Sequence, residues 1–256
     1  MELLHLNPEE ERFADRMDDL FQLCRQKNIP RFSTFLDERQ QKIAQMVSLR
    51  YPQSVHRLFG GYEGAQRQML GVFPDYMEPS QEAFPLVGVT ATYRQVDSPT
   101  HRDFLGALMA LMIKREAIGD LVLIPQEGKA VLFLSQPVAP LVLEELRKVG
   151  KVGIQLQEGI PENLTRQESF QLVSGTVLSP RLDAVLSVVL PLSREKATRL
   201  IRQGKVSVNH EETLTPTRHL QEGDLLSVRG FGRFQLDAFG AVSKKGRLHI
   251  TCKKFV

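Results

Sequence analysis

The segment that most constrains this chain is a short basic helix followed at once by a strand, within residues 193–209, SREKATRLIRQGKVSVN. Ser193 is a favourable N-cap, because its hydroxyl can accept a hydrogen bond from a free N–H in the first helical turn. Apolar residues recur behind it at helical spacing, and Gly204 stands where a left-handed C-terminal cap is expected. Residues 205–209 alternate like a strand and end at the turn residue Asn209. The pattern predicts a helix with one apolar and one cationic face, braced by a small sheet.

The cationic face of this helix indicates a polyanionic ligand. Arg199 and Arg202 lie opposite the apolar stripe, and Arg194 and Lys196 lie on its flanks. A lone basic helix usually only solvates a surface, but here the positive charge extends further. Residues 171–256 hold 14 Lys and Arg against 7 Asp and Glu, a net charge of +7, while the remaining residues carry 19 against 23. This asymmetry favours a nucleic acid partner for the C-terminal third.

Motifs on both sides of the basic helix extend the pattern. Arg181-Leu182-Asp183 opens a helix before it, and a Gly-Asp pair and the run VRGFGRF follow it. In this order and spacing, the motifs closely resemble the S4 domain, an RNA-binding module, over residues 178–234. The resemblance implies phosphate contacts from the basic side chains, with two polar residues shaping the helix start and the turn. The RNA-binding residues expected on this ground are Arg181, Ser193, Arg194, Lys196, Arg199, Arg202, Lys205, Asn209, Arg229 and Arg233.

Other polar residues of this region allow two interpretations. Asp183 is expected to cap its helix or to pair with a neighbouring arginine, and Asn209 to shape its turn. Lys244, Lys245 and Arg247 either extend the basic patch or decorate a hairpin around a glycine.

The first 78 residues carry helical signals. Asn7-Pro8-Glu9-Glu10 combines an N-cap, a first-turn proline and acidic residues at a helix start. An apolar stripe at helical spacing follows it as far as Cys24, and a second helix is expected after Ser33. Residues 55–74 contain four glycines and are expected to form a loop-rich segment with a short helix.

From about Phe84 the hydrophobic period changes. The expected strands cover residues 86–93, 121–124, 130–134 and 153–156. With one helix after the first strand and another over residues 140–149, the order βαββαβ is typical of a ferredoxin-like sheet. RNA-recognition motifs share this topology but stack bases on aromatic residues of the central strands. The third strand here offers only Phe133, which we expect in the core. Lys114 and Arg115 either add a second RNA contact or solvate a helix end.

Motifs spread over the whole chain define a second resemblance. FLDERQQKIA, GGYEGAQRQ and HRDFLGALMALMIKREAIGD, followed by the C-terminal module, are similar to the YlmH family of bacteria, which has relatives in photosynthetic lineages. The resemblance implies an α+β chain with an N-terminal helical domain (1–78), a middle RRM-like, ferredoxin-like domain (79–168) and an S4-type RNA-binding domain (178–240). Residues 241–256 are expected to form a C-terminal basic hairpin or tail. The sequence departs from the family at Leu111-Met112, where glycine is frequent.

Enzymatic interpretations find little support in the sequence. S4 domains also occur fused to pseudouridine synthases, some of which carry their catalytic aspartate in an RLD motif. Only 73 residues follow Asp183, too few for a large catalytic sheet. No nucleophile elbow or glycine-rich methyltransferase turn is present, and the six histidines lack metal spacing. We expect no catalytic residue, metal or cofactor, and Cys24 and Cys252 are expected to be buried or free thiols.

The sequence therefore predicts a non-catalytic, monomeric, cytoplasmic protein that docks on structured rRNA or tRNA. The family resemblance implies the large ribosomal subunit and peptidyl-tRNA as partners, in quality control of stalled ribosomes. No apolar run is long enough for a bilayer, so no membrane contact is expected. Two alternatives remain open: an RNA-modifying enzyme of the pseudouridine synthase type, and a protein-interaction adaptor with a photosystem II-related role.

Overall fold

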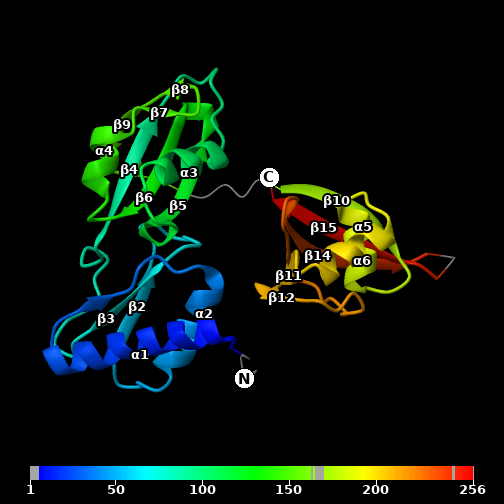
Figure 1. Cartoon of the computed structure of the whole chain (residues 1–256), viewed down its shortest axis with the longest axis horizontal. Helices are drawn as coiled ribbons and strands as arrows, with labels where there is room; N and C mark the ends of the chain where they lie inside the picture. The colour runs from blue at the N-terminus through cyan, green and yellow to red at the C-terminus, as the bar shows by residue number, and fades with distance from the viewer. Residues whose placement is uncertain (1–5, 163, 165–169, 244–245, 256) are drawn as a thin grey trace. The chain divides into compact units, whose positions relative to one another are not determined.

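The computed structural model describes residues 6–162, 164, 170–243 and 246–255. The chain divides into two compact units, Met1–Arg166 and Gln167–Val256, and each mixes helices with antiparallel sheets (Figure 1). This composition of elements confirms the predicted α+β class. The boundary expected between residues 78 and 79 falls inside the first unit. In the part of the chain that the structure describes, no helix has the length and apolar character needed to cross a bilayer.

The N-terminal part of the first unit contains both predicted helices and a three-stranded sheet. The elements are α1 (Pro8–Lys27), β1 (Arg31–Phe32), α2 (Glu38–Ser48), β2 (Val55–Phe59) and β3 (Met69–Phe73). The sheet has the order β1-β3-β2. The prediction of a loop-rich segment with a short helix over residues 55–74 is therefore wrong, because β2 and β3 lie in this range. Gly71 lies within β3, where an added Cβ would meet the rings of Phe73, Phe84 and Phe32, so this glycine makes room for aromatic packing instead of a turn.

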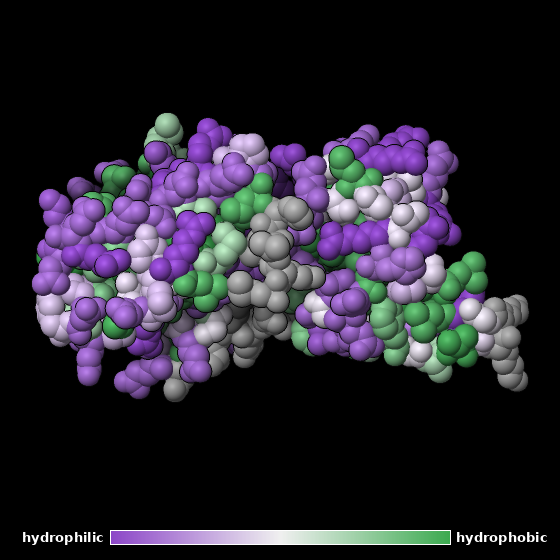
Figure 2. Space-filling view, turned by 90° about the horizontal axis from the view of Figure 1, so that it is seen from below, coloured by the Kyte–Doolittle hydropathy of each residue, from purple (hydrophilic) through white to green (hydrophobic). Residues whose placement is uncertain are grey.

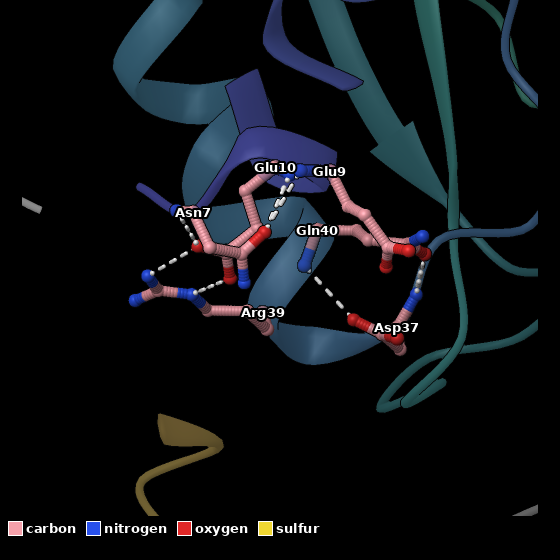
Figure 3. Close-up of polar contacts among 6 residues, drawn as sticks. All are labelled: Asn7, Glu9, Glu10, Asp37, Arg39 and Gln40. Carbon is pink, nitrogen blue, oxygen red and sulfur yellow. Dashed lines mark hydrogen bonds and ion pairs between the residues drawn. The ribbon is translucent and has the colours of Figure 1, made fainter. Parts of the chain in front are cut away.

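Figure 3 shows how the starts of α1 and α2 are joined. The Glu10 carboxylate accepts a hydrogen bond from the Asn7 N–H (3.0 Å) and completes the capping box of α1. The same carboxylate accepts from Arg39 of α2, at 2.8 Å from Nε and 3.2 Å from Nη2. These hydrogen bonds favour the charged form and lower the pKa of Glu10. One carboxylate thus caps one helix and fixes the other.

This contact predicts a pH-dependent contribution to stability. We expect Glu10→Gln to lower the free energy of unfolding by about 1–2 kcal/mol at pH 7, because a charge-assisted pair is lost. The folded-state pKa of Glu10 lies below its ordinary 4.5, so the stabilisation is present above that value and disappears as the pH falls through the folded-state pKa. Urea unfolding at pH 7 and at lower pH measures the difference. Glu11→Gln, an exposed position in the same turn, is the control, and equal pH profiles for both variants would contradict the expectation.

The middle part of the first unit is a four-stranded sheet with two helices. Its main elements are β4 (Leu86–Thr92), α3 (His101–Ala110), β5 (Ile118–Ile124), β6 (Lys129–Ser135), α4 (Ala139–Glu145) and β9 (Gln155–Glu158). The strand order β5-β6-β4-β9, antiparallel throughout, confirms the predicted ferredoxin-like βαββαβ arrangement. The smaller elements, which were not predicted, are β7 (Lys148–Val149), β8 (Val152–Gly153) and the 3-10 turns Arg115–Ala117 and Pro125–Glu127.

Both faces of β6, a central strand of the middle sheet, are buried. Leu132 and Leu134 of β6 face the core formed with α3 and α4, while Val131 and Phe133 face residues of the N-terminal part. The Tyr62 ring stacks on Phe133 with centroids 4.9 Å apart and an interplanar angle of 19°. Phe133 is 1% exposed, which confirms that it belongs to the core. The face that RNA-recognition motifs use to stack bases is therefore occupied by the protein's own side chains.

A buried carboxylate joins the N-terminal part to the middle sheet. Asp120, 7% exposed, accepts hydrogen bonds from the Tyr62 hydroxyl (2.8 Å) and from the backbone N–H groups of Gln66 (2.7 Å) and Arg67 (3.0 Å). The Arg67 guanidinium donates to the carbonyls of Ile118 and Phe35, at 3.0 and 2.9 Å. We call these contacts the Asp120 joint. It unites the GGYEGAQRQ and IKREAIGD motifs, which lie far apart in the sequence.

Arg115 also belongs to this buried region. Its Nη1 donates to the Ile118 carbonyl at 2.6 Å, and burial together with the nearby Arg67 lowers the pKa of Arg115 to about 10. Lys114 beside it is exposed. Of the two cations considered as a second RNA contact, Arg115 is therefore engaged in contacts within the protein, next to the Asp120 joint.

Met112 adopts a backbone conformation that favours glycine. Its φ is +61°, and its side chain is 90% exposed, so no packing offsets the strain. We expect Met112→Gly to raise the free energy of unfolding by about 1 kcal/mol. Met109→Gly, within α3, is the matched control and should lower it by about 1 kcal/mol. The midpoints of urea unfolding distinguish the two variants. If both variants are less stable than the wild type, the backbone of Met112 is not strained in the way proposed.

The C-terminal unit is a six-stranded antiparallel sheet with two helices packed on one face. Its elements are β10 (Phe170–Val177), α5 (Leu182–Val189), α6 (Arg194–Arg202), β11 (Val206–Val208), β12 (Glu211–Glu212), β13 (Leu225–Val228), β14 (Gly232–Val242) and β15 (Leu248–Phe255). The strand order is β10-β15-β14-β13-β11-β12. Leu186 and Ile201 of the helices share a core with Phe234, Leu236 and Ile250 of the sheet. We call the face beneath the helices the inner face and the opposite one the outer face.

Both cysteines are buried free thiols, as predicted. Burial raises the pKa of Cys252 to about 11, so this thiol stays protonated and unreactive near neutral pH. Figure 2 shows a largely hydrophilic surface on the C-terminal unit, with hydrophobic surface near the turn end of β14 and β15.

Candidate nucleic-acid interface

A buried aspartate fixes two arginines at the starts of α5 and α6. The Asp183 carboxylate, 5% exposed, lies 3.0 Å from Arg181 Nη2 and 3.0 Å from Arg194 Nε, and each guanidinium makes a second bond to it. Burial alone would raise the pKa of Asp183, but the hydrogen bonds from Arg194 and Arg181 outweigh it and lower the pKa. The expectation that Asp183 pairs with a neighbouring arginine is confirmed. The guanidiniums remain 33% and 50% exposed and can still reach an anion.

The cationic face of α6 is presented as predicted. The Ser193 hydroxyl accepts from the Lys196 N–H (3.3 Å) at the helix start, and Gly204 follows the helix with φ of +66°. Ala197 and Ile201 are fully buried, while Lys196, Arg199 and Arg202 are exposed. Arg199 lies 3.6 Å from Glu195, but this pair is exposed and restrains the arginine little. A guanidinium in this position can grip two phosphate oxygens at once.

Three further predicted residues lie around β11, the strand after α6: Lys205 and Arg229 at one end and Asn209 at the other. The Arg229 N–H donates to the Lys205 carbonyl at 2.9 Å, so the backbones of these two exposed cations are adjacent. Asn209, with φ of +52°, donates to Asp224 (2.8 Å) and accepts from the Leu225 N–H (2.9 Å). Asn209 therefore shapes the turn, as its sequence position indicated.

Arg233 does not join this group. It precedes Phe234 and Leu236, which point into the core, so its own side chain lies on the outer face. There its Cζ lies 5.3 Å from the centroid of the Phe255 ring. The remaining cations of the candidate patch are Arg247, which is exposed, and Lys244 and Lys245, which lie outside the described residues.

The sequence interpretation missed two groups of candidate residues. Arg218 lies beside the Asp183 pair, since its carbonyl accepts from the Leu182 N–H at 2.8 Å, but no motif surrounds it in the sequence. Phe170, Lys253 and Phe255 gather around Arg233 on the outer face. The signal for Lys253 and Phe255 was the alternation of residues 248–255, which can be interpreted only once the strand pairing is known.

The fold and the cationic helix define the class of protein. Residues 180–226 match the S4 domain family, and residues 79–162 match the family described as "Putative RNA-binding domain in YlmH". The chain is therefore an RNA-binding protein of the S4 type.

A full-length relative gives the family. The chain is 31% identical over 252 residues to "Ribosome-associated protein quality control protein P2" of Bacillus subtilis (strain 168), covering 98% of this chain and 97% of that protein. The chain belongs to the YlmH family, as its motifs predicted. Its fold is also similar to the solved structure "Cell division protein ylmH from Streptococcus pneumoniae", with a TM-score of 0.53, 21% identity, and coverage of 62% of this chain and 96% of that one.

Proposed function

We propose that this protein binds structured rRNA of the large ribosomal subunit, together with tRNA, through the cationic face of α6 and the arginines held by Asp183. It acts there as a monomer in quality control of stalled ribosomes in the cytoplasm. The observation that carries the proposal is the helix itself. One side is fully buried at Ala197 and Ile201, so the helix is rigidly placed, and the other side presents Lys196, Arg199 and Arg202 to solvent.

Shape and phosphate positions are what such a surface can recognise. A-form RNA hides its base edges in a deep, narrow major groove, so proteins that bind folded RNA rely mainly on backbone contacts. Paired arginines fixed in orientation by Asp183 add directionality to an otherwise diffuse positive field. The similarity to the Bacillus subtilis relative, which is named a ribosome-associated quality control protein, supports the ribosome as the location of this RNA.

The geometry of Asp183 favours a non-catalytic role. In the enzymatic alternative this carboxylate is the catalytic group. Here it is 5% exposed and engaged by two guanidiniums, which leaves it neither accessible nor free to form a covalent bond. We therefore propose binding without chemistry.

Co-sedimentation of the full chain with separated ribosomal subunits across a salt series tests this function. We expect the protein to pellet with the large subunit at low salt and to be released steeply as salt rises, because each phosphate contact releases counterions. Sedimentation with the small subunit alone, or binding that does not change with salt, would refute the proposal. Mass spectrometry of bound RNA nucleosides after incubation tests the enzymatic alternative directly, and a new modification would establish it.

A further inference from the structure

The outer face of the C-terminal sheet is built differently from the inner one. Both helices of this unit pack on the inner face, against residues such as Leu236 and Ile250. Side chains that alternate with these point the other way. They include Phe170, 44% exposed, and Leu172, 62% exposed, on β10. Solvent-exposed apolar side chains contribute little to stability, and a group of them on one face is typical of an interaction site.

Strand pairing gathers aromatic and cationic side chains on this face. Phe170 stands directly opposite Phe255, and Lys253 stands opposite both Leu172 and Gln235. The Arg233 guanidinium lies 5.3 Å from the Phe255 ring centroid, and Lys253 Nζ lies 5.2 Å from that of Phe170. Two adjacent aromatic rings, each with a cation beside it, thus occupy neighbouring strands. We call this group the outer-face cluster.

The positive charge of the C-terminal unit favours an anionic ligand for the outer-face cluster. Lys253 is 2.6 Å from Asp237, which offsets its charge locally, and Arg233 lies against the Phe255 ring. The unit as a whole carries a net charge of +7 over residues 171–256. A long-range positive field of this kind draws polyanions toward every open face of the unit.

Exposed aromatic rings next to cations are the chemistry by which proteins hold unpaired nucleotides. Bases stack on the rings whatever their sequence, while arginine and lysine contact the phosphates between them. A protein partner would fit less well, because two cations at the centre of the cluster would lose their hydration. The middle domain cannot supply such a platform, since its equivalent sheet face is covered by Tyr62 and its neighbours.

We propose that the outer-face cluster is a second RNA-binding surface, which stacks unpaired nucleotides of an RNA whose folded part lies on α6. The proposal extends the proposed function and rests on it for the identity of the ligand, but it uses different residues. The strands that carry the cluster, β10, β14 and β15, lie outside the residues 180–226 that match the S4 domain. The protein would therefore distinguish an RNA that has a single-stranded extension from one that is fully paired.

Fluorescence anisotropy of the full chain with two labelled RNAs tests this proposal. The probes are a 12-nucleotide oligouridylate, which stays unpaired, and a blunt hairpin. We expect Phe170→Leu/Phe255→Leu to weaken oligouridylate binding on the order of tenfold and hairpin binding less than about twofold, since leucine keeps the apolar volume but offers no stacking surface. Leu178→Ala, also exposed in this unit (67%), is the control and should bind both probes as the wild type does.

A second variant and a cross-link keep the test independent of folding. Arg233→Gln/Lys253→Gln should weaken oligouridylate binding several-fold, and 4-thiouridine in the oligonucleotide should cross-link to peptides of β14 and β15. The proposal is overturned if the folded leucine variant binds the oligonucleotide like the wild type, if the wild type does not bind it, or if cross-links fall only on α6. If the wild type binds the oligouridylate but not the hairpin, the function proposed for α6 is refuted, whereas the proposal for the outer-face cluster is retained.

Discussion

Reversing the charge of Lys196, Arg199 and Arg202 to glutamate is expected to lower the affinity for ribosomal RNA by about 100-fold or more near physiological salt. Each lost phosphate contact also removes roughly one unit from the slope of log affinity against log salt concentration. All three side chains are exposed and lie opposite the buried residues of α6, so the fold should tolerate the change. Arg194 is left unchanged, because its loss would deprive the buried Asp183 of a partner.

Filter binding or co-sedimentation over a salt series measures this effect. Arg25→Glu/Lys27→Glu/Lys42→Glu changes the net charge equally, at exposed positions of α1 and α2, and provides the matched control. We expect the control to lose much less affinity and to keep the wild-type slope. A folded α6 variant with wild-type affinity would show that RNA binds elsewhere.

Asp120→Ala should be the most destabilising single substitution among the polar residues of the first unit. It leaves the Tyr62 hydroxyl and two backbone N–H groups without their buried acceptor, next to the guanidiniums of Arg67 and Arg115. We expect a loss of about 3–5 kcal/mol in the free energy of unfolding. Tyr62→Phe removes a single bond of the joint and should cost about 1 kcal/mol.

Tyrosine fluorescence during urea unfolding is a selective probe for this prediction. All four tyrosines lie in the first unit and the chain has no tryptophan, so the signal reports on that unit alone. Asp97→Ala is the matched control, because its partner Arg94 is 81% exposed and a solvent-exposed ion pair contributes little to stability. If the Asp120 and Asp97 variants unfold at the same urea concentration, the joint has no special role in stability.

The parts of the fold that the sequence predicted are those governed by local rules. Ser193 and Gly204 mark the two ends of α6 through their own conformational preferences, and Asn7 marks the start of α1 in the same way. The βαββαβ order followed from hydrophobic periods alone. Each of these signals lies within a few residues of the element that it defines.

The parts that could not be predicted depend on contacts between distant segments. Asp120 meets Tyr62 and Arg67 only after two sheets have packed, and no local pattern announces it. Gly71 suggested a loop, although its role is to admit aromatic rings. Arg233 was grouped with the α6 cations because it belongs to the VRGFGRF run of the S4 resemblance. Strand alternation places it on the opposite face of the sheet, beside a phenylalanine from another strand.

The central place of β15 in the C-terminal sheet has a consequence for biosynthesis. β15 lies between β10 and β14, so β10 can form its strand pairing, for example Val177 with Leu248, only after β15 has been synthesised. A nascent chain emerges at about 5–20 residues per second, and non-local strand pairing is slow. The first unit can therefore fold while translation continues, whereas the RNA-binding unit completes its sheet only after β15 has left the exit tunnel. A newly made molecule thus acquires its affinity for RNA only after the last strand of this sheet has emerged.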